Sequence, residues 1–426
     1  MRHNQPLKPL SLTPPHSVLQ CGLREAFFFC AFSGFSIFRV GSSVVEQLPF
    51  KENVVSSILT RPTIVELSTN NLKHTCDMKK FFLAVPLVLV TLSLSGCSFP
   101  GKSVSGGGSA ILRSSDGGKT YVPKVTIDEK TTIAPANVVS FAFEAGNPNR
   151  ITLGTRENGI FMSENGGDVW KKLTFPPTKT YGLVADWSTP ARLYATGVWQ
   201  DRGKIYRSED RGAKWDEIYT EPNTGTVITL LVQNPKRPET LYAGTSAGVV
   251  FRTTDGGQTW GSLQSVDAPA LGLVFDSAGD TLYVLSSGKG LFRSRDGGAT
   301  FESIPGKSRA SVTKTLPEVT SIASDPSRSG TLYAGTKNGL FRSKDFGDAW
   351  EEVSVIESSK KFPIRSIAIN PRNSNEIIYG AALAVYKSVD GGATWSVYQL
   401  DANRAVGTIR YSPSDSSVMY LGLRTF

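Results

Sequence analysis

The sequence predicts an all-β protein built from repeated four-stranded units. Short runs rich in β-branched and aromatic residues lie between clusters of Gly, Asp, Asn and Pro, and helix-period apolar patterns are scarce beyond the N-terminal region. An octapeptide of the kind SRDGGATF recurs seven times, and its third residues lie 41 to 49 residues apart. A period in this range is typical of repeat architectures, among which the β-propeller is the leading all-β case.

Each period carries four strand-like runs, which are clearest in the unit that starts at residue 319. The runs are VTSIASDP, TLYAGT, GLFRSKDFG and AWEEVSV, so the octapeptide falls between the third and fourth runs. The same order appears in TLLVQNP, TLYAGT, VVFRTTDGG and TWGSLQS. Four antiparallel strands per repeat make one blade of a propeller.

The two ends of the repeated region supply one further blade between them. The region opens with two runs, AILRSSDGG and TYVPKV, and closes with two others, GTIRYSP and VMYLGL. We therefore predict a single seven-bladed propeller over residues 110–426, in which strands within 406–424 pair with strands within 110–124. A ring of six blades would leave two half-blades with exposed edges.

The octapeptide is predicted to staple the hairpin between the third and fourth strands. Its Asp or Asn can accept backbone N–H groups across the turn, its Gly pair permits positive φ, and its final aromatic can pack against adjoining strands. The third-position residues are Asp116, Asn165, Asp210, Asp255, Asp296, Asp345 and Asp390. The aromatics that end the second to seventh octapeptides are Trp170, Trp215, Trp260, Phe301, Trp350 and Trp395. The alternative is a ring of calcium or catalytic sites. It is disfavoured because each octapeptide offers one carboxylate whereas calcium takes six to eight oxygen ligands.

The motif S/T-x-D-x-G-x-T-W/F resembles the Asp box, or BNR repeat, of sialidases, xyloglucanases, sortilin-type receptors and photosystem II stability/assembly factors. The resemblance extends over residues 108–426. It implies a propeller fold and leaves the activity open, because function belongs to sites and not to the fold.

The distribution of cysteine and histidine excludes several kinds of chemistry from the propeller. The last cysteine is Cys97, and the three histidines are His3, His16 and His74. Residues 110–426 therefore hold no Ser-His or Cys-His catalytic pair and no His-ligated metal, and we expect no cofactor. The segment 1–96 holds nine Lys or Arg and five Asp or Glu, which leaves +5 of the net charge of +9 to the rest. This excess, without a basic stripe, does not predict nucleic-acid binding.

The segment 78–96 resembles a bacterial lipoprotein signal peptide. Lys79 and Lys80 precede an apolar run from Phe81 to Leu94, and Leu-Ser-Gly-Cys ends it at Cys97. The resemblance implies that Cys97 is lipidated and that the mature protein is extracytoplasmic, in the outer membrane of a two-membrane bacterium. Residues 97–109 are rich in Ser and Gly and form a predicted flexible tether. Residues 1–77 are interpreted as an upstream extension of the reading frame, since 41–63 can be back-translated to resemble a tRNA gene.

A basic residue recurs immediately before the octapeptide. These residues are Arg113, Arg207, Arg252, Arg293, Arg342 and Lys387. The favoured interpretation is a solvated strand face that pairs with acids of the fourth strand, such as Glu302 and Glu351. The alternative is a basic array that binds a partner.

Two irregular loops are the candidate partner-binding sites, because loops of a repeat protein are free to differ. The loop 196–206 contains Trp199, Arg202 and Lys204, and the loop 304–318 contains Lys307, Arg309 and Lys314. An aromatic beside cations suits an anionic or protein partner. Packing of Trp199 over a neighbouring loop is an equal alternative.

These observations favour a monomeric, lipid-anchored, non-catalytic scaffold for envelope proteins or glycans, similar to photosystem II assembly factors or sortilin-type propellers. The alternative is a glycoside hydrolase of sialidase or xyloglucanase type. The Arg-Ile-Pro segment usual in sialidases is absent. Hydrolysis needs two carboxyl groups roughly 5–10 Å apart. The acids expected on the loop face are Asp128, Glu129, Glu157, Asp201, Glu221, Asp267, Glu318, Glu357 and Asp401.

Overall fold

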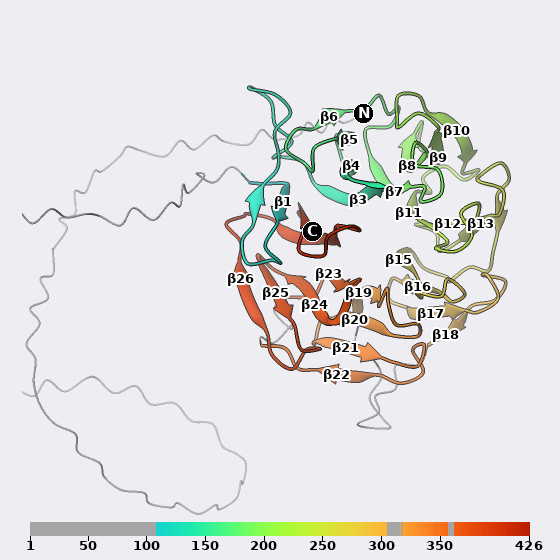
Figure 1. Ribbon diagram of the computed structural model, residues 1–426. Coiled ribbons are helices and arrows are strands. Elements are labelled where there is room, and N and C mark those ends of the chain that lie inside the picture. The colour runs from blue at the N-terminus through green and yellow to red at the C-terminus, as the bar shows by residue number, and fades with distance from the viewer. Residues whose placement is uncertain (1–107, 305–315, 317, 357–361) are drawn as a thin grey trace, which may run out of the picture. The chain divides into compact units, whose positions relative to one another are not determined.

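The computed structural model describes residues 108–304, 316, 318–356 and 362–426, and these form seven four-stranded antiparallel sheets. The sheets are arranged as blades around a centre (Figure 1). The chain divides after Ser95, and every described residue belongs to the unit Gly96–Phe426. Within the described ranges, the structure contains no helix that could span a membrane.

We number the blades I to VII and give their strands from the innermost outward. Blade I contains β27 (Ala405–Tyr411), β28 (Met419–Arg424), β1 (Ile111–Ser114) and β2 (Val122–Pro123). Blade II contains β3 (Val138–Glu144), β4 (Asn147–Thr155), β5 (Gly159–Ser163) and β6 (Lys171–Lys172). Blade III contains β7 (Thr180–Ala185), β8 (Leu193–Trp199), β9 (Arg202–Ser208) and β10 (Asp216–Thr220).

The remaining blades follow in chain order. Blade IV contains β11 (Ile228–Gln233), β12 (Leu241–Thr245), β13 (Val250–Thr253) and β14 (Gly261–Ser262). Blade V contains β15 (Ala270–Phe275), β16 (Leu282–Ser286), β17 (Gly290–Ser294) and β18 (Glu302–Ser303). Blade VI contains β19 (Val319–Ser324), β20 (Leu332–Thr336), β21 (Leu340–Ser343) and β22 (Glu351–Val353). Blade VII contains β23 (Ser366–Asn370), β24 (Asn373–Ala381), β25 (Ala384–Ser388) and β26 (Ser396–Gln399).

The predicted fold, with seven blades and a shared closing blade, is confirmed. In blade I, β1 pairs with β28 in the register Ile111↔Gly422 to Ser114↔Met419, so strands from the two ends of the propeller form one sheet. Innermost strands of consecutive blades contact one another around the ring, including β27 with β3. The outermost strands are shorter than the sequence indicated, and β2, β6, β14 and β18 have two residues each.

The apolar core lies between neighbouring blades. One cluster joins Tyr283, Leu285 and Leu291 of blade V to Leu332 and Trp350 of blade VI. Since both faces of a blade are covered, second strands such as LYAGT in β12 and β20 are buried at all five positions and do not alternate with polar residues.

The propeller has two faces with different connections. The octapeptides, called boxes below, contact the loops between first and second strands, as when Gly256 N donates to Glu239 O over 2.9 Å. We call this the box face. Connections between second and third strands contact the connections that join consecutive blades. For example, Ser246 N donates to Val227 O over 2.8 Å. We call this the loop face.

Candidate functional site

Each box is closed by hydrogen bonds between its first and third side chains and its own backbone. In the box at 253–260, Thr253 Oγ1 donates to Asp255 Oδ1 over 2.7 Å and accepts the N–H of Gly257 at 2.9 Å. Asp255 Oδ1 also accepts the N–H of Thr259 at 3.0 Å. The contact between the first and third side chains measures 2.7 to 2.8 Å in all seven boxes, Asn165 included. Gly257 has φ of 90°, a conformation that favours glycine.

These hydrogen bonds keep the box carboxylates ionised. Bonds from the Thr side chain and backbone, followed by the Ser hydroxyl, lower the pKa of Asp296 and Asp390 from 3.8 to about 2. The pKa values of Asp116 and Asp255 are lowered further by the same kind of contact. A carboxyl group that is ionised at neutral pH cannot donate a proton as a general acid, so this geometry suits a structural acceptor.

The closing aromatics are buried to different degrees. Trp170, Phe301 and Trp350 are buried, whereas Trp215, Trp260 and Trp395 are partly buried. The indole N–H of Trp350 donates to Gly347 O over 3.0 Å, which holds the ring against its own turn.

A link between blades, which the sequence analysis did not predict, joins boxes to the preceding blade. Tyr194 and Arg207 of blade III both donate to the carbonyl oxygen of Gly256 in the box of blade IV, over 3.2 and 3.0 Å. Tyr242 and Arg252 do the same to Gly297, over 2.9 and 2.8 Å. Arg293, Arg342, Lys387 and Tyr420 make equivalent contacts with Phe346, Gly391, Gly117 and Gly166. The sequence feature that could have predicted this link is the Tyr that recurs in the second strands.

Five of the six basic residues before the boxes therefore bond the box of the following blade, namely Arg207, Arg252, Arg293, Arg342 and Lys387. Arg293 and Arg342 do pair with Glu302 at 2.7 Å and Glu351 at 2.6 Å, as expected. However, the Arg293 side chain is only 7% exposed, so the expectation of a solvated face is wrong at this position. The physical reason is that its second nitrogen turns toward the box of the next blade.

Trp199 lies at an exposed hairpin tip on the loop face. It pairs with Arg202 across a two-residue turn, Gln200 and Asp201, whose φ values of 52° and 58° are typical of a type I′ turn. The strands β8 and β9 extend to this turn, so the segment is a tight hairpin and not the longer loop expected for 196–206. The Trp199 side chain is 44% exposed.

The two cations near Trp199 make internal contacts. Arg202 donates to the carbonyl oxygens of Glu221 and Pro222, over 3.3 and 2.8 Å. Lys204 is buried, and its Nζ pairs with Glu217 Oε2 at 2.6 Å. Trp199 is therefore the most available of the three predicted residues. Cys97, Lys307, Arg309 and Lys314 lie outside the described residues.

Several acids expected on the loop face are bound within their own surroundings. Glu157 accepts from Asn137, Glu318 pairs with Lys337, and the buried Glu221 accepts from Tyr219 and Asn223. Asp128 accepts from Thr131, which lowers its pKa. Glu357 lies outside the described residues. In the described part of the chain, no cluster of three or more His, Cys, Asp or Glu could hold a metal ion.

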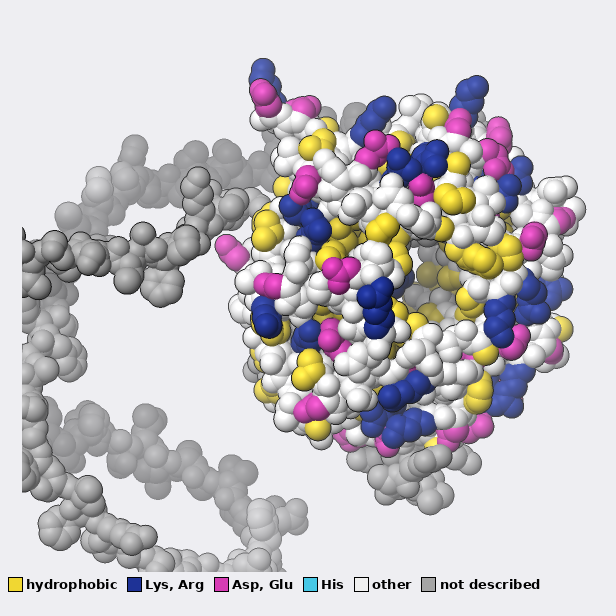
Figure 2. Space-filling model, in the orientation of Figure 1, with side chains coloured by type: hydrophobic (Ala, Val, Ile, Leu, Met, Phe, Trp, Pro, Cys, Tyr) yellow, Lys and Arg dark blue, Asp and Glu magenta, His cyan; other side chains and the backbone are white. Residues whose placement is uncertain are grey.

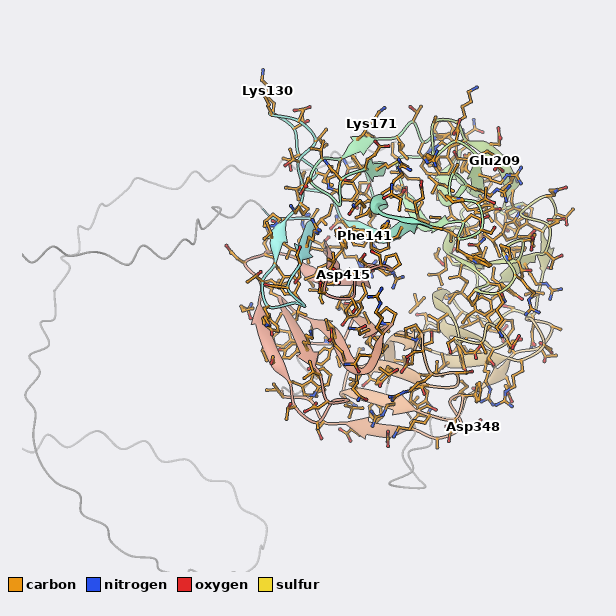
Figure 3. All side chains as sticks on the ribbon, in the orientation of Figure 1. Lys130, Phe141, Lys171, Glu209, Asp348 and Asp415 are labelled. Carbon is orange, nitrogen blue, oxygen red and sulfur yellow. The ribbon has the colours of Figure 1, made fainter. Side chains whose placement is uncertain are left out.

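A cavity of about 450 Å³ lies between blades V and VI on the loop face. Its lining includes Lys289, Leu291, Ile304, Glu318 and Val319. The volume is within the range of small-molecule sites, although one acidic residue alone does not provide a hydrolytic pair. Figure 3 shows the labelled residues Lys130, Lys171, Glu209 and Asp348 toward the outside of the ring, and Phe141 near its centre.

Comparison with known proteins finds the BNR-Asp box repeat at residues 205–218 and 340–353. A xyloglucanase of Paenibacillus sp is 26% identical over 350 residues, which cover 68% of this chain and 29% of that enzyme. A xyloglucanase of Hypocrea jecorina is 28% identical over 203 residues, 46% of this chain and 23% of that enzyme. The chain thus spans less than a third of the length of the curated relatives it matches.

Solved structures share the fold. The xyloglucanase of Xanthomonas campestris superposes with a TM-score of 0.57 at 16% identity, over 68% of this chain and 51% of that chain. A structure of YCF48 bound to D1 peptide gives a TM-score of 0.54 at 18% identity, over 70% of this chain and 97% of that chain. The curated relatives favour the glycoside hydrolase alternative over the scaffold interpretation. With seven boxes, one in each of seven four-stranded sheets, this chain is a BNR/Asp-box β-propeller.

Proposed function

We propose that this propeller is directed at glycans of the xyloglucan class. The observation that carries the proposal is the 26% identity to a xyloglucanase across 68% of the chain. Similarity of sequence over this length reaches beyond the boxes, which occupy only a small part of each blade. The class of ligand is therefore taken from the matched xyloglucanases. Whether the protein also hydrolyses this ligand is argued from the residues of the loop face.

The loop face offers a surface that suits a sugar ring. Trp199 presents a large, partly exposed aromatic face on a hairpin whose tight turn fixes its direction. Aromatic side chains combine apolar area with few rotatable bonds, so they lose little entropy when a ligand stacks on them. The internal contacts of Arg202 and Lys204 hold the strand beneath Trp199 in place.

Binding is better supported than hydrolysis by the described residues. Glu157, Glu221 and Glu318 belong to connections of different blades, and each is engaged by a neighbouring side chain. The matched enzymes are more than three times as long as the aligned share of this chain. We therefore propose glycan recognition, with hydrolysis as the activity to be measured beside it.

The experiment compares two tryptophans of equal exposure on opposite faces. Trp199 is 44% exposed on the loop face, and Trp187 is 45% exposed in a box-face loop, where its indole N–H donates to Asn234 O. Calorimetry with xyloglucan oligosaccharide should give binding that Trp199→Ala weakens by about tenfold or more, as for a central aromatic contact. Trp187→Ala should leave it unchanged.

Reducing-end release from xyloglucan is measured on the same samples. Release that Trp199→Ala reduces would assign hydrolysis as well as binding to the loop face. Absence of binding to xyloglucan, or equal losses in the two variants, would overturn the proposal.

Peptide binding is a second candidate, favoured by a different observation. The match to YCF48 covers 97% of that chain, so nearly the whole of the YCF48 structure superposes on this propeller. Capture of envelope proteins on the immobilised full chain, with Trp199→Ala as control, tests this function. A protein that is retained by the wild type and lost in the variant would support it over glycan recognition.

We also propose that Cys97 anchors the protein by a lipid outside the cytoplasm, as its sequence context indicates. The Cys97→Ser variant should move from the detergent phase to the aqueous phase on phase partition. Detergent partition that is unchanged in this variant would rule out the anchor.

A further inference from the structure

The described chain enters the propeller at the loop face. Second strands end at this face and third strands begin there, so β1, the third strand of blade I, starts at the loop face with Ile111. Ala110 O accepts the N–H of Leu423 at 2.8 Å, and Figure 1 shows β1 beside the C-terminal end of the chain. Gly108 lies against the side chain of Asn403, in the connection between β26 and β27. The chain that precedes the propeller therefore departs from the loop face.

The distance from this point to Cys97 is limited by the length of the chain between them. Ten residues separate Cys97 from Gly108 in the sequence. A chain of this length reaches at most about 36–40 Å when it is fully extended. A flexible chain rich in Ser and Gly has a much shorter average end-to-end distance, about 17–20 Å at this length. A lipid on Cys97 would therefore hold the loop face within roughly 40 Å of the membrane surface.

The opposite orientation needs most of this length. To place the box face on the membrane, the chain would have to pass outward over β2 and then along the height of blade I. From the spacing of strands and their rise per residue, the path past β2 and along the six residues of β28 is roughly 25 Å, even without the side chains and turns that it must clear. A chain held near its full extension loses conformational entropy, which opposes this orientation.

The distribution of exposed aromatic residues agrees with an orientation in which the loop face is near the membrane. Of the exposed Trp and Phe side chains among the described residues, Trp199, Phe362 and Phe426 lie on the loop face, and Trp187 lies on the box face. Aromatic rings favour the interfacial zone of a membrane. Exposed apolar side chains are also scattered elsewhere over the ring (Figure 2), so the aromatic rings, and not apolar residues in general, distinguish the two faces.

We propose that the loop face is the membrane-proximal face of the anchored protein and that the box face points away from the membrane. This inference rests on the proposed lipid anchor at Cys97, whereas the choice of face rests on the place where the chain enters the propeller. A ligand that reaches Trp199 then binds in the space between the propeller and the lipid surface. The anchored protein therefore selects short glycan chains over long polymers, because the tether limits the height of this space to about 40 Å.

Energy transfer from the protein to the membrane tests the orientation. No cysteine follows Cys97 in the sequence, and in the anchored protein its thiol carries the lipid, so one introduced cysteine can carry a fluorescent donor. Ala247→Cys and Thr254→Cys form a matched pair, because both residues are exposed and they flank β13 of blade IV at the loop face and the box face. Asn338→Cys and Lys344→Cys flank β21 of blade VI in the same way.

The lipidated protein is placed on phosphatidylcholine vesicles that contain a headgroup-labelled acceptor lipid. In both blades, transfer from the loop-face label should exceed transfer from the box-face label by about twofold or more, since a blade height of about 20 Å separates the two labels. Equal transfer within both pairs on vesicle-bound protein, or stronger transfer from the box-face labels, would overturn the orientation alone. The Cys97→Ser variant should lose transfer from all four positions. Transfer that persists in this variant would overturn the anchor, and the orientation with it.

Binding of glycans of two lengths tests the consequence for ligands. Xyloglucan oligosaccharide should bind the vesicle-anchored protein and the soluble Cys97→Ser variant with equal affinity. Xyloglucan polymer should bind the anchored protein severalfold more weakly than the variant, and duplication of residues 98–107 should restore this binding by lengthening the tether. Equal affinity of the two forms for the polymer would overturn the selection of short chains. Absence of xyloglucan binding in the soluble variant would overturn the proposed glycan ligand, while the energy-transfer result still decides the orientation.

Discussion

At the scale of single residues, the box shows how one octapeptide can recur without being a catalytic site. Its Ser or Thr and its Asp or Asn satisfy donors of a tight turn, and its aromatic closes the turn against neighbouring strands. Asn165 makes the same contact with Ser163 as the aspartates make with their partners. Acceptance of hydrogen bonds, and not negative charge, is therefore the shared property.

The closing aromatics should contribute to stability in proportion to their burial. Trp350 is 0% exposed, so Trp350→Ala should lower the free energy of unfolding by about 3–5 kcal/mol. Trp260 is partly buried and its Nε1 has no hydrogen-bond partner, so Trp260→Ala should cost less. Urea denaturation of both variants measures the difference, and equal losses would contradict the dependence on burial.

The box aspartates should make stability depend on acid pH. The folded protein lowers the pKa of Asp296 and Asp390 from 3.8 to about 2, so their ionised form is favoured in the fold. Their contribution is present above about pH 4 and is lost as the pH falls toward 2. The urea midpoint of the double variant Asp296→Asn, Asp390→Asn should therefore fall less between pH 5 and pH 2 than that of the wild type. An unchanged fall would mean that other groups dominate.

At the scale of elements, the link from second and third strands to the next box explains how blades keep their order. The Tyr and Arg donors of one blade share a single carbonyl oxygen of its neighbour, as at Gly256 and Gly297. A blade thus carries a polar contact to the next blade in addition to the apolar core between them. Blade II lacks these donors, because Thr152 and Met162 stand at the two positions.

Loss of one such link should destabilise the protein measurably. Arg293→Met introduces the residue that blade II has at the equivalent position, Met162. The substitution removes the bonds to Phe346 O, Asp348 and Glu302. We expect a loss of about 1–3 kcal/mol, since these bonds involve a charged group. Urea denaturation measures the loss, and Arg295→Gln, on the exposed side of the same box, is the control. A loss below 0.5 kcal/mol, on the order of ordinary surface changes, would contradict the link.

At the scale of the whole molecule, stability depends on closure of the ring. Blade I combines β27 and β28 with β1 and β2, and β27 also contacts β3 of blade II. Closure gives blade I four paired strands, as in every other blade, and buries residues such as Leu421 and Ile111 completely. It also brings Arg156, Arg365 and Arg424 from three blades to one place.

Removal of residues 405–426 should therefore abolish cooperative folding. The deletion takes away β27 and β28, leaves β1 without its partner, and exposes the apolar cluster around Leu112 and Ile378. Thermal unfolding followed by circular dichroism should lose its single transition. A truncated chain that unfolds cooperatively at the wild-type temperature would contradict closure by blade I.

The sequence by itself determined the repeat, the number of blades, the position of each box and the closing blade. These follow from local patterns, namely the spacing of Asp116 to Asp390, the alternation of strand and turn signals, and the half-repeats at both ends. Only the tertiary structure decided which side chains are available. As charged residues, Lys204 and Arg293 would be expected at the surface, but both side chains are buried in ion pairs. Arg156, Arg365 and Arg424 are separated by up to 268 residues in the sequence and lie together because the ring brings blades VII, I and II side by side. Such convergence depends on the packing of blades, which no local pattern specifies.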